Sequence, residues 1–148
     1  MLRRLLTLTA LAGAAVLAGA SVAARDKPNG IVVQDLAYGE VLFDFFQDDY
    51  FEALTRLLAA RERGELKHHE AESELLLGGL YLSYGEHRLA GEIFERVLAQ
   101  SVAPELADRA WFFLAKIWYE RGYLDDAAAA LARIGAELPA DLEPQRQM

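Results

Sequence analysis

Residues 77–98, LGGLYLSYGEHRLAGEIFERVL, decide the fold that the sequence predicts. Small and large residues recur at helical spacing on both sides of a central glycine, Gly85. A small residue at Gly78 allows a second helix to approach closely, and the ring of Tyr81 fills the space beside it. Gly85 supplies the left-handed backbone conformation that a tight reversal requires. The stretch therefore predicts two helices packed against each other.

The same unit recurs at a fixed interval of 37 residues. Sequence repeats of 20 to 50 residues are typical of stacked supersecondary units. The positions that keep this interval are Val41, Gly78 and Ala115 before the turn, Asp48, Gly85 and Gly122 in the turn, and Ala53, Ala90 and Ala127, Leu57, Phe94 and Leu131, and Ala60, Val97 and Ile134 after it.

Apolar residues keep helical spacing from residue 35 almost to residue 138, and no stretch alternates with period two for long enough to form a strand. We therefore expect an all-α protein. The expected helices cover residues 35–46, 50–63, 69–84, 86–100, 104–121 and 124–138.

The repeated unit resembles the tetratricopeptide repeat, whose first helix carries Trp-Leu-Gly-Tyr-type positions and whose second helix carries Ala-Phe-Ala-type positions. The second unit has Glu74 in place of the tryptophan. In the first unit, Glu40 and Asp44 stand at usually apolar positions. Either the register slips toward the nearby phenylalanines Phe43, Phe45 and Phe46, or this is a terminal repeat with a wetter face. The third unit follows the pattern through Trp111, Leu114, Ala115, Trp118, Gly122, Ala127, Leu131, Ile134 and Pro139.

The resemblance implies a right-handed α-solenoid of about three helix-turn-helix repeats within residues 35–138, with units near 35–66, 67–103 and 104–138. It also implies that the first helices line a concave groove for a protein or peptide segment. An apolar, aromatic groove suits a helix or an extended hydrophobic segment. The alternative is that these side chains cover one another or pack against a further part of the chain that is missing from this sequence. The implied groove residues are Tyr38, Leu42, Phe45, Leu75, Leu82, Arg109, Phe112, Lys116 and Tyr119.

Residues 1–24 have the pattern of a secretory signal peptide: two arginines, an apolar run, and small residues before a cleavage point near Ala23 or Ala24. This pattern predicts a periplasmic or secreted protein. An uncleaved inner-membrane anchor is the alternative. Residues 25–34 are expected to form a linker. Residues 139–148 are expected to form a tail or the start of a further repeat, and an unfinished repeat would favour homo-oligomers.

Composition argues against several classes of function. The net charge of −8 disfavours nucleic acid and anionic membrane surfaces as partners. The chain has no cysteine, which excludes a disulfide, a thiolate nucleophile and a cysteine-based zinc site. His68 and His69, with Glu70 and Glu72, form the only metal-like cluster in the sequence. Adjacent histidines on a helix point in different directions, so we expect a solvated turn, with no metal and no cofactor.

No phosphate-binding glycine loop or catalytic triad spacing occurs in the sequence. We therefore expect a non-catalytic scaffold or assembly factor of the bacterial cell envelope, which binds an apolar segment of a partner protein. The alternative is a docking arm of a larger enzyme or of a polysaccharide export complex.

Overall fold

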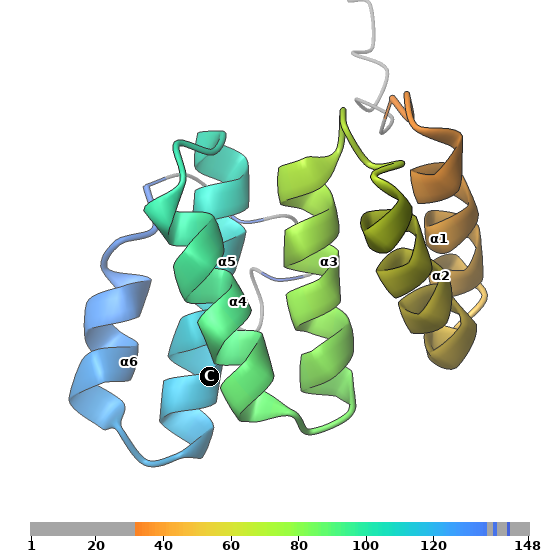
Figure 1. Cartoon of the computed structure of the whole chain (residues 1–148). Helices are drawn as coiled ribbons and strands as arrows, with labels where there is room; N and C mark the ends of the chain where they lie inside the picture. The colour runs from red at the N-terminus through yellow and green to blue at the C-terminus, as the bar shows by residue number, and fades with distance from the viewer. Residues whose placement is uncertain (1–31, 136–137, 139–141, 143–148) are drawn as a thin grey trace, which may run out of the picture. The chain divides into compact units, whose positions relative to one another are not determined.

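The computed structural model describes residues 32–135 together with Leu138 and Leu142. The expected leader and most of the expected linker lie outside the described residues. In the described part of the chain there are six α-helices and no strand, which confirms the all-α class there (Figure 1). None of these helices is long and apolar enough to cross a membrane. The helices are α1 (Leu36–Phe46), α2 (Tyr50–Arg63), α3 (Glu70–Ser83), α4 (His87–Ala99), α5 (Pro104–Glu120) and α6 (Leu124–Leu131).

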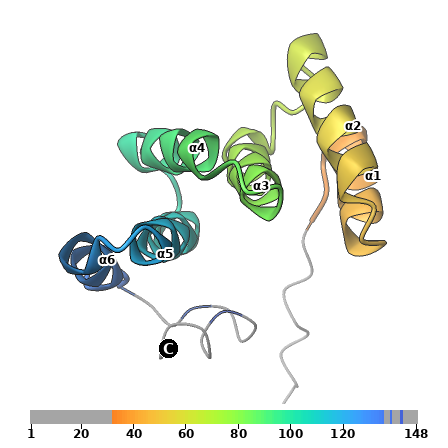
Figure 2. The same ribbon diagram turned by 90° about the horizontal axis from the view of Figure 1, so that it is seen from below.

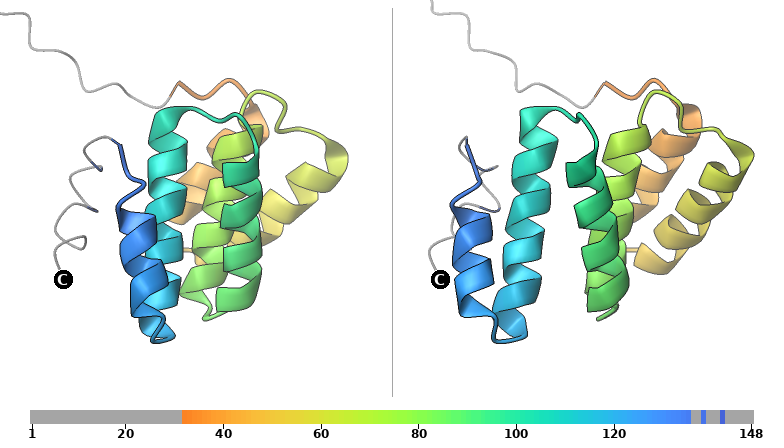
Figure 3. Two further views of the ribbon diagram at one scale, coloured as in Figure 1. Left: turned by 90° about the vertical axis from the view of Figure 1, so that its left-hand side faces the viewer. Right: turned by 60° about the vertical axis from the view of Figure 1, so that its left-hand side comes forward.

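Consecutive helices form three hairpins, α1–α2, α3–α4 and α5–α6, each closed by a short turn (Figures 1 and 2). The hairpins contact one another mainly through α4 and α5, with further contacts of α3 to α2 and α5. The two views in Figure 3 show the α3–α4 and α5–α6 hairpins from other sides. The described helices therefore have a repeat-like arrangement.

The three turns have the same backbone conformation. The residue at the repeated turn position has a positive φ in every unit: 61° at Asp48, 76° at Gly85 and 83° at Gly122. In each turn, the next N–H donates to a carbonyl oxygen five residues earlier, as in the Schellman motif. These bonds run from Asp49 to Asp44 (3.0 Å), from Glu86 to Tyr81 (2.9 Å) and from Tyr123 to Trp118 (2.9 Å).

Replacing Asp48 with glycine is expected to raise the free energy of unfolding by about 0.5–1 kcal/mol, because glycine adopts a positive φ without steric cost. The substitution removes an exposed hydrogen bond from the Tyr50 hydroxyl, which contributes little. Urea denaturation followed by circular dichroism measures the change. Gly85→Asp is the matched control and should lower stability, so a gain there or a loss in Asp48→Gly would contradict the shared turn geometry.

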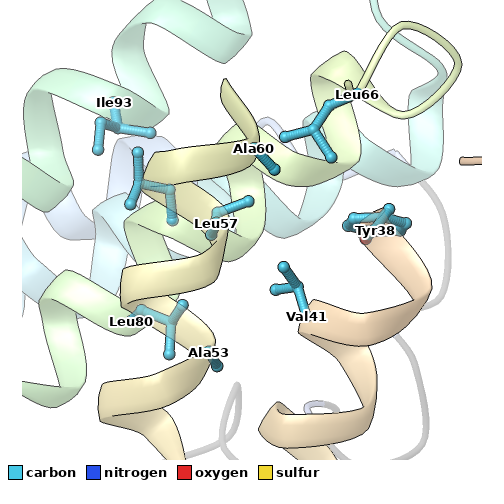
Figure 4. Packing of buried hydrophobic residues seen from close by; sticks show 9 residues of the cluster. Tyr38, Val41, Ala53, Leu57, Ala60, Leu66, Leu80 and Ile93 are labelled. Carbon is cyan, nitrogen blue, oxygen red and sulfur yellow. The ribbon is translucent and has the colours of Figure 1, made fainter. Parts of the chain in front are cut away.

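The first helix keeps the register of the repeat. Val41 is fully buried and faces the Ala53, Leu57 and Ala60 side of α2 (Figure 4). Phe43 and Phe46 are instead 66% and 68% exposed. The register therefore does not slip toward the phenylalanines. Asp44 stands at a usually apolar position. Its carboxylate is compensated there by an ion pair with Arg56 of α2, whose Nε lies 2.7 Å away.

The close approach of α3 and α4 depends on Gly78, as expected from the small-to-large pattern. A Cβ atom at Gly78 would lie 2.5 Å from Cε1 of Phe94, a distance that real contacts do not reach. Phe94 is fully buried and stacks on Phe113 of α5 at 5.2 Å between ring centroids. One phenylalanine thus joins three helices.

Glu74, at the position of the expected tryptophan, is buried and forms an ion pair with Arg61 of α2. Its other oxygen lies 3.8 Å from Arg96 of α4. In the next unit, 37 residues later, the guanidinium of Arg133 lies 5.2 Å from the ring centroid of Trp111. The same arginine position therefore contacts a carboxylate in one unit and an aromatic ring in the other.

The expectation that the last helix reaches residue 138 is wrong, because α6 ends at Leu131. The N–H groups of Arg133 and Ile134 donate to carbonyl oxygens three residues earlier, which tightens the chain out of the helix. The N–H of Gly135 then donates to Oδ1 of Asp108 at 3.0 Å, which holds the departing chain on α5. Ile134 is accordingly half-buried beyond the helix end.

Candidate functional site

Eight of the nine expected groove residues, together with Gly79, form three rows along the first helices α1, α3 and α5, and each row keeps the 37-residue interval. Arg109 lies beside these rows near the start of α5. The inner row is Tyr38, Leu75 and Phe112, the middle row is Leu42, Gly79 and Lys116, and the outer row is Phe45, Leu82 and Tyr119.

The inner row is buried in all three units. The ring of Tyr38 stacks on His69 at 4.6 Å between centroids, and Leu75 belongs to the apolar cluster around Phe94. Burial, together with the nearby charge of Glu72, raises the pKa of Tyr38 to about 12, and the charge of Arg109 opposes this rise. These inner side chains therefore belong to the core and do not line an open groove.

The middle and outer rows remain accessible. No atom lies within 4 Å of where a Cβ atom at Gly79 would sit, so there is open space beside α3. In the outer row, Phe45 and Leu82 are half-buried, and Tyr119 is 60% exposed. Lys116 of the middle row is exposed as well. The accessible part of the first-helix face is thus apolar, with a cation at its α5 end.

The cover over Phe112 includes residues from the chain beyond α6. Phe112 is 3% exposed, and it forms an apolar cluster with Leu138 (5% exposed) and Leu142 (7% exposed). Phe113 packs edge-on against the Phe112 ring at 5.5 Å. Phe112 therefore belongs to an apolar cluster that includes residues beyond α6. The sequence pattern did not predict this contact: Leu138 was expected to end the last helix, and Leu142 is an apolar residue in an otherwise polar stretch.

The expectation of a solvated turn at the two histidines is wrong for His69, which is buried. Asp35 accepts hydrogen bonds from the N–H groups of His68 (2.7 Å) and His69 (3.2 Å), and its other oxygen lies 2.7 Å from Nδ1 of His68. Nε2 of His69 accepts the N–H of Gln34 at 2.9 Å, so the proton of the neutral ring lies on Nδ1. This cluster fastens the start of α1 to the α2–α3 connection.

Loss of the Asp35 charge is expected to destabilise the protein in acid. The hydrogen bond to His68 holds the pKa of Asp35 below its ordinary value of 3.8. A carboxylate with a lowered pKa stabilises the fold above the unfolded-state pKa, and that contribution disappears as the pH falls through the folded-state pKa. Asp35→Asn should therefore flatten the pH dependence of the unfolding free energy below about pH 4. Asp49→Asn is the control, and an equal flattening there would contradict this assignment.

A cavity of about 320 Å³ lies where α2 ends and α3 begins. Its charged lining residues are two cations, Arg61 and Lys67, and two carboxylates, Glu70 and Glu74. Because Arg61 is already paired with Glu74, the lining does not favour one charge of ligand. Among residues 32–135, Leu138 and Leu142, no three His, Cys, Asp or Glu side chains are placed to hold a metal ion.

The middle and outer rows combine half-buried apolar side chains and the exposed ring of Tyr119 with the open space beside Gly79. Each row repeats one helical position in the successive first helices. In comparisons with known proteins, neither a family model nor a curated protein matches this chain.

Proposed function

We propose that this chain is a non-catalytic protein-binding module of the tetratricopeptide type, a right-handed solenoid of three helix pairs. It binds an apolar segment of a partner protein along its first helices. The observation that supports this function is the repeated first-helix face, whose outer row is apolar and whose middle row leaves open space beside Gly79.

The recognition is burial of apolar surface. Each square ångström of apolar area removed from water contributes about 25 cal/mol, so side chains such as Leu82 and Tyr119 supply affinity when a partner covers them. A helix or an extended segment fits such a face. The net charge of −8 favours a partner segment flanked by basic residues.

The module acts in the bacterial cell envelope as a scaffold or assembly factor, after export directed by residues 1–24. Cleavage near Ala23 or Ala24 releases a chain that begins at Ala24 or Arg25. N-terminal sequencing of the protein recovered from the periplasm tests this step, and an intact Met1 on a membrane-bound protein would contradict it.

A matched pair of glycine substitutions tests the binding face. A Cβ atom added at Gly79 on α3 or at Gly91 on α4 would meet no atom within 4 Å outside its own helix backbone and chain neighbours, so we choose leucine at both positions. Leucine also forms helices better than glycine, so both variants should stay folded. Gly79→Leu fills the first-helix face, whereas Gly91→Leu changes the second helix of the same hairpin.

The chain from Arg25 onward serves as bait in an envelope extract, with circular dichroism confirming that each variant is folded. The unchanged chain and Gly91→Leu should capture the same partner, and Gly79→Leu should lose it. Equal capture by all three proteins would place binding on another surface. Capture of no partner by any of them would contradict the proposed function.

A further inference from the structure

The first hairpin exposes a face whose counterparts are buried in both later units. We call it the leading face, and it consists of Leu36, Glu40 and Phe43 of α1 and Arg56 of α2. All four residues are exposed, Leu36 by 80% and Phe43 by 66%. The counterparts at the 37-residue interval are all buried: Ser73, Leu77, Leu80 and Ile93 in the second unit, and Ala110, Leu114, Ile117 and Ala130 in the third.

The cover in the later units includes the second helix of the preceding unit. Leu77 and Leu80 of α3 belong to one apolar cluster with Leu57 of α2 (Figure 4). Leu114 of α5 belongs to another cluster with Phe94 of α4. The α1–α2 hairpin lies at one end of the row of hairpins, and no described helix precedes it (Figure 1). The leading face therefore occupies the position on which the second helix of a preceding unit packs.

The leading face carries excess negative charge. Three carboxylates share the guanidinium of Arg56. Its Nε lies 2.7 Å from Asp44 and 3.1 Å from Glu52, and its Nη1 lies 3.4 Å from Glu40. Three negative charges and one positive charge leave an excess of two negative charges. An occupant that buries this surface therefore needs a cation opposite Glu40, where the second unit has the apolar Leu77.

A hollow of about 630 Å³ opens beside the start of α1, and Leu36 and Glu40 line it. It gives a long basic side chain room to reach the Glu40 carboxylate. The charged lining residues are three carboxylates and two cations, so the hollow also favours a cation: Asp35, Glu40 and Glu65 against Arg63 and Lys67.

We infer that the leading face binds an amphipathic helix of a second protein, packed on α1 as α4 packs on α5. The helix presents apolar side chains to Leu36 and Phe43 and a lysine or arginine to Glu40. Apolar side chains that recur every three or four residues form such a face on a helix. The leading face shares no residue with the middle and outer rows, so this is a second binding surface beyond the proposed one.

A second copy of this chain fits the leading face less well. Its own leading face carries the same excess of negative charge. Its last second helix, α6, begins with Asp125 and Asp126. Because like charges that face each other weaken an interface, the charge favours a basic partner over self-association.

The test crosslinks the leading face in envelope extract. The photoreactive residue p-benzoylphenylalanine replaces Phe43 in the full chain, or replaces Tyr123, which is 52% exposed, as the control. Position 43 should crosslink to a protein other than this chain. Mass spectrometry should locate the link in a segment that has apolar residues at helical spacing and a lysine or arginine among them. Position 123 should not give this product.

A charge exchange tests the contact with Glu40. Glu40→Lys should lower the yield of the position-43 product about tenfold, because two facing cations repel each other. Changing the basic residue of the partner segment to glutamate should restore the yield. Glu62→Lys is the matched control, since it makes the same change in net charge at an exposed position of α2, and it should leave the yield unchanged. Circular dichroism confirms that both variants are folded.

Three results would overturn the inference. The first is the absence of a product from position 43. The second is a product that contains only a second copy of this chain. The third is an equal yield in Glu40→Lys and Glu62→Lys. Gly79→Leu should leave the position-43 product unchanged, so a failure of this inference is distinguishable from a failure of the proposed binding face.

Discussion

Replacing Phe94 with alanine is expected to lower the free energy of unfolding by about 3–5 kcal/mol. The ring is fully buried between Gly78 of α3 and Phe113 of α5, so its removal leaves a cavity shared by three helices. A small domain is stable by about 5–15 kcal/mol, and the variant should therefore retain little of its stability. Urea denaturation followed by circular dichroism measures the loss.

Phe43→Ala is the matched control, because the same substitution is made at a ring that is 66% exposed. Its effect should stay within about 0.5 kcal/mol. Similar losses at Phe43 and Phe94 would mean that Phe94 does not join the helices as described.

Gly78→Ala is expected to lower the free energy of unfolding by about 1–3 kcal/mol. The added methyl group would lie 2.5 Å from the Phe94 ring, which is fully buried and stacked on Phe113. The neighbouring Gly79→Ala should instead raise the free energy of unfolding by up to about 1 kcal/mol, because alanine favours the helix and meets no atom within 4 Å. Adjacent glycines should therefore respond with opposite signs.

A double substitution isolates the contact. In a Phe94→Leu background, the ring that meets the new methyl group is gone, so the loss caused by Gly78→Ala should shrink. An unchanged loss in that background would attribute the effect to the α3 backbone and not to the contact with α4. A stabilising Gly78→Ala would contradict the close helix approach altogether.

The repeat interval predicted most of the fold because it reports local geometry. The left-handed turns at Gly85 and Gly122 and the buried triad of Ala90, Phe94 and Val97 follow directly from the spacing of residues in the sequence. The end of α6 did not follow, since Ile134 continues the helical spacing although the chain has already turned toward Asp108. That turn includes the hydrogen bond from the N–H of Gly135 to Asp108, 27 residues earlier in the chain. A local sequence pattern does not predict a contact over such a separation.

The site was harder to predict for the same reason. The spacing correctly placed Tyr38, Leu75 and Phe112 on first helices, but burial depends on what packs over them. Tyr38 is covered by a histidine from the α2–α3 connection, and Phe112 by leucines beyond the last helix. Such cover is set by tertiary contacts, so the accessible part of the first-helix face is limited to the middle and outer rows.

The most direct test of the proposed binding face is site-specific photo-crosslinking in envelope extract. The photoreactive residue p-benzoylphenylalanine replaces Tyr119, which is 60% exposed in the outer row, or Tyr123, which is 52% exposed at the start of α6. The first-helix face predicts a crosslink from position 119 to an apolar segment of one partner, with none from position 123. A crosslink from position 123 alone, or none from position 119, would contradict it.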